Sequence, residues 1–442
     1  MTLLLLLVSV VVIVLLITRL KLHPFLALLF VSIAFGLVSG MKPAMIISSI
    51  QDGFGGTLGK IGLLIILGVI IGAFLEHTGG ALKLAEKILD LIGKKRVTTA
   101  MGIVGYIVSI PVFADSGFIL LASLNRNLTK KAGLSLAGTA IALGLGLGCT
   151  HAMVPPTPGP IAAAGLLNAD LGLVMLIGLG AAAFALVAGL FYAKKIAAKV
   201  YIDPDMGEAP VTTRDNFSPT LFRSSLPIIV PILLIVLKSL SGFLNDEGFQ
   251  ATLKNFLSFI GEPVIALIIG FFLCLLLPKK LEKSMLSTEG WVGKALTDSA
   301  TIILITGAGG IFGKVLQNSD LSAIIGENLS TYNLGIWLPF ILAAAFKSAQ
   351  GSSTVSLITT ASIMVTLMPA LGLTSEIDKA LVVIAIGAGS LIVSHANDSF
   401  FWVITQLSGM DVKTGYKLHT TGTLVIGIAA MIFVFILYSN LH

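Results

Sequence analysis

Long uninterrupted apolar runs constrain this chain more than any other feature of its sequence. Two of them, Thr2 to Thr18 and Ile61 to Leu75, contain no charged residue. Charged residues make up 11% of the 442 residues, whereas a typical soluble domain has roughly 25%. A helix that spans a membrane takes roughly 20 apolar residues, so the chain has room for about ten to a dozen such helices and little else. These proportions exclude a soluble enzyme.

The same runs decide the fold class. Strands of a membrane β-barrel alternate between apolar and polar residues, and the runs in this chain do not. Lipid offers the backbone no hydrogen-bond partners, which leaves the α-helix as the spanning structure. We therefore predict an all-α polytopic protein embedded in the lipid bilayer.

Few residues suggest a cofactor, a metal or a nucleic acid. Cys149 and Cys274 each lie in an apolar run without a CxxC pair or a histidine-rich neighbourhood, so neither a disulfide nor a metal site is indicated. The net charge of +6 fits an excess of loop lysines, and no basic segment carries interleaved aromatic residues that would stack on bases. The sequence has no GxxxxGK[ST] motif, and Gly307 to Gly310 lie in an apolar run where they favour close helix packing. We expect no cofactor, no nucleic-acid partner and no ATP-driven transport.

Clusters of lysine and arginine predict the orientation of the chain, because loops rich in these residues stay in the cytoplasm. Val97 to Leu124 has such a cluster at both ends, so it starts and finishes on the same side of the membrane. Pro111, Asp115 and Gly117 interrupt its middle and oppose one continuous helix. We predict a re-entrant helical hairpin in this segment.

A second interrupted run, Gly335 to Pro369, lies between weakly charged loops that we assign to the outside. The polar segment from Lys347 to Thr354 falls halfway along it. This pattern predicts a second hairpin, which enters from the opposite face. The same charge assignment places both termini in the periplasm, and Ala81 to Gly93 is predicted to be an amphipathic helix along the membrane surface.

Two further breaks follow glycine-rich helices, at Cys149 to Pro160 and at Ser394 to Ser399. With these landmarks each half of the chain has the same order: two helices, a third helix, a hairpin, a broken helix and a closing helix. The halves run in opposite directions, which is the signature of a secondary transporter with its site near the membrane midplane. We assign residues 1–193 to the first inverted repeat, 194–224 to a cytoplasmic linker and 225–442 to the second repeat.

Asp115 is the first candidate for proton coupling. An ionised carboxylate at membrane depth costs roughly 2.5 to 3.5 kcal/mol on insertion scales, so something must compensate for it, and uptake of a proton would do so. In the alternative interpretation Asp115 caps the second helix of its hairpin. The neighbouring Ser116 is a candidate substrate contact.

The second hairpin tip offers a cation and several small polar groups. Lys347 is a candidate to neutralise a substrate carboxylate, and a lysine that reaches interfacial water is the alternative. Small polar groups with free backbone amides at a helix start suit an anion that carries hydroxyls. The candidates of this kind are Gln350, Ser352, Ser353 and Thr354. Hydroxyl residues also pack helices together in lipid, which is the structural alternative.

The two breaks contain polar pairs at corresponding positions of the repeats. Thr150 with His151 occupies the first break, and Ser394 with His395 occupies the second. Each histidine is either a substrate ligand or a hydrogen-bonding link between helices. We count all four residues as substrate-binding candidates because their recurrence in both repeats is unexpected by chance.

The second break also holds Asn397 and Asp398, an amide and a carboxylate that suit polyol hydroxyls or a proton. We predict Asn397 as a substrate contact and Asp398 as a second proton-coupling residue. The four prolines from Pro155 to Pro160 are expected to fix an extended backbone beside the site. The remaining histidines, His419 among them, lie at loops or chain ends and are treated as background.

These motifs resemble the gluconate permease (GntP) family of bacterial proton-coupled sugar-acid carriers, within the ion transporter superfamily. The resemblance covers essentially the whole chain, and its most specific segments are Thr150-His151 with Pro155 to Pro160, Asn168 to Gly172, Gly351 to Val355, and Ser394 to Asp398 with Phe401-Trp402. It implies uptake of gluconate, a related aldonate, glycerate or, in one branch, D-serine by proton symport across the inner membrane. By fold-level analogy it also implies a homodimer with a scaffold part and a transport part that moves like an elevator.

Two departures from the family pattern bear on the substrate. Members that take gluconate carry a Tyr-Glu-Val-Gly type sequence at the first tip, where this chain has Ala114 to Gly117, and an arginine where Lys347 stands. The expected substrate is therefore a small organic anion, either an aldonate or a smaller hydroxy acid such as glycerate. A passive anion channel is the competing class. An intramembrane enzyme is a weaker one, because no nucleophile and base stand at a fixed spacing.

Overall fold

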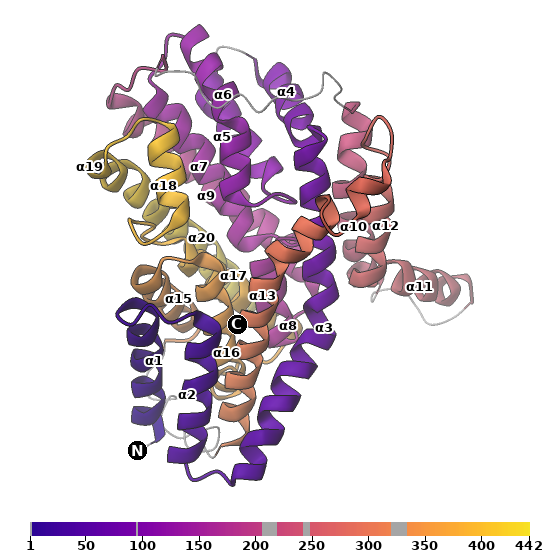
Figure 1. The fold of residues 1–442 in the computed structure, drawn as a ribbon, viewed down its shortest axis with the longest axis vertical. Helices are drawn as coiled ribbons and strands as arrows, with labels where there is room; N and C mark the ends of the chain where they lie inside the picture. Colours follow the sequence, from indigo (N-terminus) through magenta and orange to yellow (C-terminus); the bar gives the residue numbers. More distant parts are fainter. Residues whose placement is uncertain (1, 94–95, 206–218, 242–247, 320–333) are drawn as a thin grey trace.

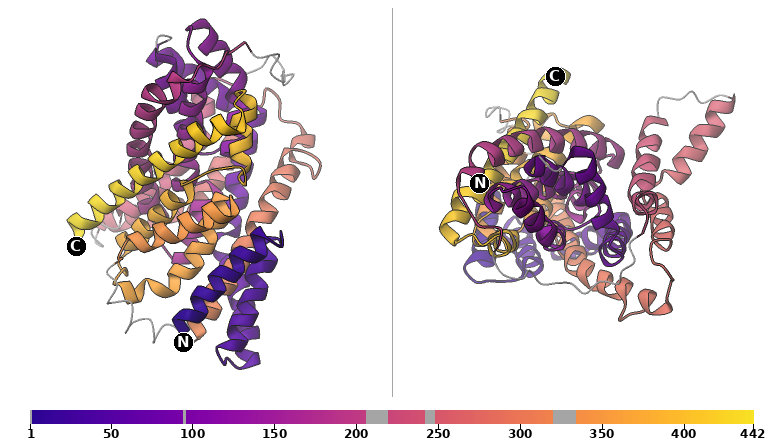
Figure 2. Two further views of the ribbon diagram at one scale, coloured as in Figure 1. Left: turned by 90° about the vertical axis from the view of Figure 1, so that its left-hand side faces the viewer. Right: turned by 90° about the horizontal axis from the view of Figure 1, so that it is seen from above.

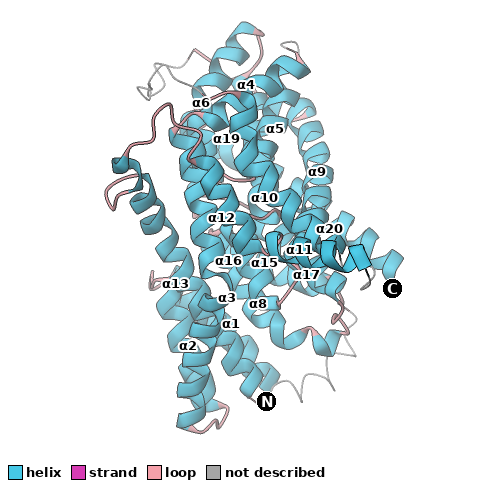
Figure 3. Cartoon of the chain, turned by 90° about the vertical axis from the view of Figure 1, so that its right-hand side faces the viewer, coloured by secondary structure: helices cyan, strands magenta, loops and turns pink. Residues whose placement is uncertain are grey.

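The computed structural model describes all residues except 1, 94–95, 206–218, 242–247 and 320–333. The described residues form helices joined by loops, with no strand among them (Figure 3). Six of the described helices are long and apolar enough to cross a membrane, and four shorter helices are also apolar. The all-α prediction is confirmed. Part of the segment predicted as a linker, residues 206–218, lies outside the described residues.

The first half of the chain begins with three helices and a short amphipathic one. These are α1 (Thr2–Thr18), α2 (Pro24–Val38), α3 (Pro43–His77) and α4 (Gly80–Ile92). Prolines open α2 and α3, where the missing amide hydrogen costs nothing because the first turn has no internal acceptor for it. In α4, Lys83 and Glu86 form an exposed ion pair while Leu84 and Ala85 are buried. The helix is amphipathic, as the sequence predicts.

The rest of the first half contains both predicted interruptions. It folds as α5 (Val97–Val108), α6 (Ala114–Lys131), α7 (Leu136–Met153), α8 (Pro158–Leu167) and α9 (Leu171–Lys195). Pro111 lies between α5 and α6, and Pro155 lies between α7 and α8. The prediction of an extended backbone through all four prolines is wrong for two of them. Pro158 and Pro160 form the first turn of α8, where proline lacks no bond that the helix would make.

The second half of the chain also contains a helical hairpin and a broken helix. It consists of α10 (Leu221–Ser241), α11 (Gly248–Ile260), α12 (Pro263–Cys274), α13 (Trp291–Asn318), α15 (Trp337–Gln350), α16 (Ser353–Leu367), α17 (Glu376–Leu391), α18 (Ser399–Leu407), α19 (Val412–Gly415) and α20 (Thr421–Leu441). A π-helical turn, Tyr416–Thr420, joins α19 to α20. Helices α15 and α16 pack against each other as the second hairpin, and α17 and α18 form the second broken helix. The division into inverted repeats and the side of the membrane that each end faces remain predictions.

The long helices α3 and α13 pack against each other next to α2 (Figure 1). Glycines make this close approach possible, since a Cβ on Gly53 would lie 2.6 Å from the carbonyl oxygen of Gly310. The packing role predicted for Gly307 to Gly310 is therefore confirmed.

Helices α10, α11 and α12 lie together at one edge of the bundle, and α11 extends outward from it (Figures 1 and 2). Leu233, Leu237, Phe256 and Phe259 are exposed there. Apolar side chains on the outside of a membrane protein are suited to contact with lipid or with another subunit.

Candidate functional site

A cavity of about 570 Å³ lies where the second hairpin, both broken helices and the start of α6 meet. Its wall includes most of the residues that the sequence predicts as a site. These are Asp115, Ser116, His151, Lys347, Gln350, Ser352, Ser353, Thr354, Ser394, Asn397 and Asp398. Thr150 and His395 do not line it. Residues far apart in the chain thus share one cavity. Ser399 on α18 donates a hydrogen bond to Asp115 on α6, 284 positions earlier in the chain.

The first turns of two helices form part of the wall. Ser352 is the N-cap of α16, and its Oγ accepts a hydrogen bond from the Val355 amide at 3.3 Å. The N-cap of α6 is Phe113, which makes no side-chain cap. Helix starts carry partial positive charge and unpaired amides, so both first turns favour an anion in the cavity.

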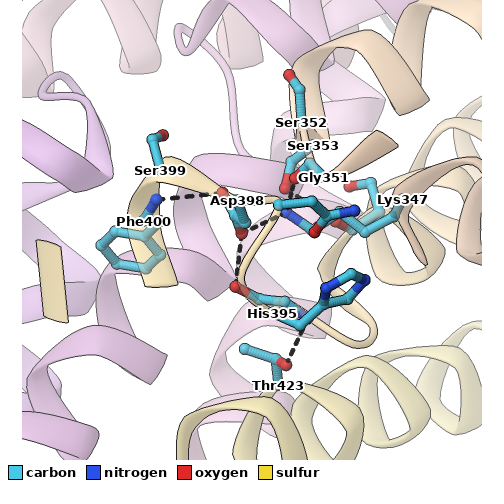
Figure 4. A network of polar contacts seen from close by, with 12 residues as sticks. Lys347, Gly351, Ser352, Ser353, His395, Asp398, Ser399, Phe400 and Thr423 are labelled. Carbon is cyan, nitrogen blue, oxygen red and sulfur yellow. Dashed lines mark hydrogen bonds and ion pairs between the residues drawn. The ribbon is translucent and has the colours of Figure 1, made fainter. Parts of the chain in front are cut away.

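Lys347 and Asp398 form a buried ion pair in the cavity wall (Figure 4). Lys347 Nζ lies 2.6 Å from Asp398 Oδ2, and the two side chains are 2% and 8% exposed. The ammonium also donates to the Gly351 carbonyl at the tip of the hairpin. Lys347 is therefore buried and paired with a protein carboxylate. The interpretation in which its ammonium reaches interfacial water is wrong.

The Asp398 side chain accepts two further hydrogen bonds besides that from Lys347. Its Oδ2 accepts from Ser394 Oγ at 2.5 Å, and its Oδ1 accepts from the Phe400 amide at 3.1 Å. The second of these bonds makes Asp398 the N-cap of α18. Its position is thus fixed by the helix that it starts, by the break that precedes it and by the hairpin opposite.

Asp115 also lines the cavity, and its side chain accepts fewer hydrogen bonds than that of Asp398. Its Oδ2 accepts from Ser399 Oγ at 2.9 Å, and its side chain is half-buried. Asp115 stands in the first turn of α6, one position inside the helix, and makes no cap bond. The structure therefore does not support the capping alternative, and the carboxyl group is free to interact with cavity contents.

The second break also fixes the hairpin tip. His395 Nε2 lies 2.8 Å from the Ser348 carbonyl oxygen, and Asn397 Nδ2 donates to the Ser348 and Ala349 carbonyls at 3.2 Å each. These are carbonyls of the last turn of α15, which have no partner within their own helix. His395 thus positions the tip from outside the cavity, whereas Asn397 does so from its wall.

The first break places its polar pair differently. His151 lines the cavity, with its ring centre 5.9 Å from that of Phe113. Thr150 points into the protein interior, where its Oγ1 is buried without a hydrogen-bond partner. Each predicted pair therefore contributes one member to the cavity, His151 from the first break and Ser394 from the second.

Four polar residues at or beside the cavity were not predicted. Asp298 on α13, Ser399 and Thr423 line it, and His419 lies directly behind Ser394, with Nε2 3.0 Å from Ser394 Oγ. His419 is fully buried, so its assignment to the background is wrong. Asp298, four residues after Lys294 and shortly before the apolar run that starts at Ile302, was visible in the sequence. The π-helical turn that holds His419, a feature frequent at functional sites, was not.

Within the described ranges no three His, Cys, Asp or Glu side chains lie close enough together to bind a metal ion. The polar groups of the cavity are instead hydroxyls, amides, carboxyls, the imidazole of His151 and one ammonium, a set that suits a polar organic molecule with a carboxylate.

Comparison with known proteins identifies the family. Residues 1–440 match the family described as GntP family permease. The chain belongs to the GntP permease family. Among its relatives, the gluconate permease of Pseudomonas aeruginosa is 32% identical over 453 residues, which cover 98% of this chain and 96% of that protein. The inner membrane permease YgbN of Escherichia coli is 35% identical over 436 residues, 93% of each chain. The D-serine transporter DsdX of the same species is 32% identical over 440 residues, 98% of this chain and 97% of that one.

The fold has solved counterparts. The YdaH transporter of Alcanivorax borkumensis superposes with a TM-score of 0.66 over 95% of this chain and 98% of that chain, at 13% identity. This GntP family member is thus a transporter and not an enzyme, and it is a multi-pass protein of the inner membrane. Its family relationship supports secondary transport of small acids.

Proposed function

We propose that this GntP permease imports a sugar acid or a small hydroxy acid, a gluconate-like aldonate or glycerate, by proton symport. The Lys347–Asp398 ion pair in the cavity wall is the observation that carries the proposal. It places a single ammonium, the group that pairs with a carboxylate, beside a protein carboxyl group that competes for it. Hydroxyls of Ser353 and Thr354 and the first turn of α16 lie next to it for the rest of the substrate.

Competition for Lys347 would couple the acid to the proton. A buried charge is expensive unless it is paired. When a substrate carboxylate pairs with Lys347, Asp398 loses its counter-ion and is expected to bind a proton. When the substrate leaves, the proton leaves and the internal ion pair re-forms. Each species then favours binding of the other, which is the linkage that symport requires.

Asp115 offers a second place for a proton. It faces the same cavity from α6 and has one hydrogen-bond donor, Ser399. An organic anion that enters this cavity meets the carboxyl groups of Asp115, Asp298 and Asp398 and the ammonium of Lys347. With all three carboxyls ionised, the lining would repel an anion, so protonation of at least one of them promotes substrate binding.

Movement is proposed by analogy with the elevator mechanism. The hairpins and broken helices would form the transport part, and helices α1 to α3 and α10 to α13 would form the scaffold. Asp298 is the one lining residue that α13 supplies, whereas the hairpins, the broken helices and α20 supply the others. A homodimer assembled through scaffold helices, with both termini in the periplasm, completes the proposal.

Uptake into proteoliposomes tests this function. Uptake of labelled gluconate, other aldonates, glycerate and D-serine should be compared without sodium, under a proton gradient directed into the vesicles. We expect saturable accumulation of an aldonate or glycerate that a protonophore abolishes. A need for sodium with indifference to the pH gradient would refute proton symport, and uptake that does not saturate would favour a channel. Preferred uptake of D-serine would overturn the substrate class.

A further inference from the structure

A second cavity, of about 240 Å³, lies between α3, α13, the end of α8 and the C-terminal half of α16. Its polar lining consists of Asp52, Thr57, Lys60, Asn168, Lys314 and Gln317. The two lysines and one carboxylate give this lining a net charge of one positive unit. None of these residues lines the central cavity.

The two lysines come from a motif that occurs once in each half of the chain. The first copy is Gly55-Gly56-Thr57-Leu58-Gly59-Lys60 on α3, and the second is Gly309-Gly310-Ile311-Phe312-Gly313-Lys314 on α13. These two long helices pack against each other at their glycines. Gly56, Gly310 and Gly313 line the cavity, so the absence of side chains there opens the space that the lysines border.

The second cavity lies farther along two helices that also line the first. On α13, Asp298 borders the central cavity and Gly310 borders the second. Twelve residues separate them, which is about 18 Å of helix at 1.5 Å per residue. On α16, Thr354 borders the central cavity and Val365 borders the second. The two cavities are therefore bordered by the same two helices at positions about 18 Å apart along α13.

The second cavity also lies at the boundary between the proposed scaffold and transport parts. Lys60 of α3 donates to Asn168 Oδ1, at the junction of α8 and α9, at 2.7 Å. This leaves the amide nitrogen of Asn168 available to a ligand. Lys314 and Asp52 have no ion-pair partner in the described part of the chain. Lys314 is half-buried and lines the cavity, so its ammonium is available to pair with an anion there.

We propose that the second cavity is a docking site for the carboxylate of a small organic anion on its way to or from the central cavity. The proposal rests on the proposed function, because it takes the transported acid as the ligand. Lys60 and Lys314 hold the carboxylate, while Thr57, Asn168 and Gln317 supply partners for hydroxyls. Clefts and cavities that bind small molecules usually measure roughly 300 to 1,000 Å³. A smaller cavity with one net positive charge suits brief capture of a monovalent anion.

Cysteine labelling tests the electrostatics of this site without requiring transport. Gly56 lines the cavity, whereas Gly59, one turn away on the same exposed stretch of α3, does not. A Cβ at either position meets nothing within 4 Å, so both Gly56→Cys and Gly59→Cys fit the fold. The native Cys149 and Cys274 are buried. Each variant is treated in detergent with an anionic and a cationic methanethiosulfonate reagent of similar size.

We expect the ratio of anionic to cationic labelling rates to be at least about threefold higher at Gly56→Cys than at Gly59→Cys. Adding Lys60→Gln and Lys314→Gln should remove the difference, and 1 M salt should reduce it because exposed charges are screened at about 3 Å. Gluconate or glycerate should slow labelling at Gly56→Cys and leave Gly59→Cys unchanged. Equal ratios at the two positions would overturn the proposal.

Two further outcomes separate this proposal from the function on which it rests. If anionic phospholipid slows labelling at Gly56→Cys and no organic acid does, the cavity is a lipid site and the docking proposal is wrong. In proteoliposomes, Lys60→Gln with Lys314→Gln should raise the KM for acid uptake several-fold with an unchanged maximal rate. Lys42 is exposed just before α3, and the control variant Lys42→Gln should change neither the KM nor the maximal rate. Wild-type protein that carries no acid would refute the proposed function even when the labelling ratio stands.

Discussion

The ammonium of Lys347 lies 2.6 Å from the carboxylate of Asp398, and water is nearly excluded from both side chains. Removing two charges from water costs several kcal/mol per ion, which their attraction repays only in part. An apolar pair of the same size would often stabilise the fold as well or better. The pair is therefore better explained by transport than by stability, since it keeps an ammonium at the cavity wall in the empty protein.

Removing one partner of this pair should be severe. In Lys347→Met the carboxylate of Asp398 stays buried without its counter-ion, and such a loss costs roughly 3 to 5 kcal/mol. We expect a marked fall in the melting temperature of the detergent-purified protein and loss of stabilisation by added substrate. The double variant Lys347→Met with Asp398→Asn should regain most of the melting temperature without regaining uptake.

An exposed pair serves as the control. Lys379 lies 2.6 Å from Glu376 in the first turn of α17, with side chains 24% and 58% exposed. Exposed pairs contribute about 0 to 1 kcal/mol, so Lys379→Met should leave both melting temperature and uptake nearly unchanged. If the double variant at positions 347 and 398 is no more stable than Lys347→Met alone, the two charges do not act as a pair.

Asp115→Asn should separate proton coupling from substrate binding. Asparagine keeps an oxygen that accepts from Ser399 Oγ, a bond of 2.9 Å in the wild type, but it does not bind a proton. We expect accumulation driven by a pH gradient to disappear while exchange of labelled for unlabelled substrate continues. Both are measured in the same proteoliposomes.

Ser399→Ala is the matched variant for this experiment. It removes the hydrogen bond to Asp115 and keeps the carboxyl group, so pH-driven accumulation should persist with a moderate change in KM. Absence of the Asp115→Asn protein from the membrane would indicate a structural role for Asp115. Retained accumulation by Asp115→Asn would assign the coupling proton to another group.

The interruptions of the helices were readable from the sequence because lipid leaves the backbone few options. A spanning segment must satisfy its own amides and carbonyls, so proline, glycine and charge inside an apolar run mark the places where it stops. The bounds of α1 coincide with the apolar run from Thr2 to Thr18, and Pro111 lies in the gap between α5 and α6. The grouping of the site residues followed from these landmarks.

The partners within the site were not readable. Lys347 and Asp398 are 51 positions apart, and Asp115 and Ser399 are 284 apart. Nothing in the local pattern tells which of two carboxyls a buried lysine will meet, because that depends on how the hairpin packs against the second break. His419 was missed for the same reason, since a single histidine before an apolar helix carries no periodic signal and its burial depends on the turn of the chain at Tyr416–Thr420.

Gly351→Ala should disrupt the second hairpin tip. Gly351 has a φ of +90°, and a Cβ there would collide with the backbone carbonyl of Asn397. The positive φ alone costs a non-glycine residue roughly 1 to 3 kcal/mol, and the collision would also displace the break that holds Asp398. We expect a lowered melting temperature and a large loss of uptake.

Gly372→Ala isolates the backbone contribution. Gly372 has a φ of +72°, but a Cβ there meets nothing within 4 Å. This variant should lose roughly 1 kcal/mol of stability and keep its uptake. If Gly351→Ala kept as much uptake as Gly372→Ala is expected to keep, the tip would tolerate the displacement that we expect at Gly351.

His419 is expected to position the site rather than to carry the coupling proton. The Ser394 hydroxyl donates its one proton to Asp398 Oδ2 at 2.5 Å, so His419 Nε2, 3.0 Å from Ser394 Oγ, must be the donor in that contact. In His419→Ala this donor is lost inside the protein, which costs about 1 to 3 kcal/mol and loosens Ser394. His419→Gln retains an amide donor and should recover part of the affinity. We therefore expect His419→Ala to raise the KM for uptake and His419→Gln to raise it less, with pH-driven accumulation intact in both. Loss of accumulation in His419→Gln, with exchange preserved, would instead make His419 the carrier of the proton.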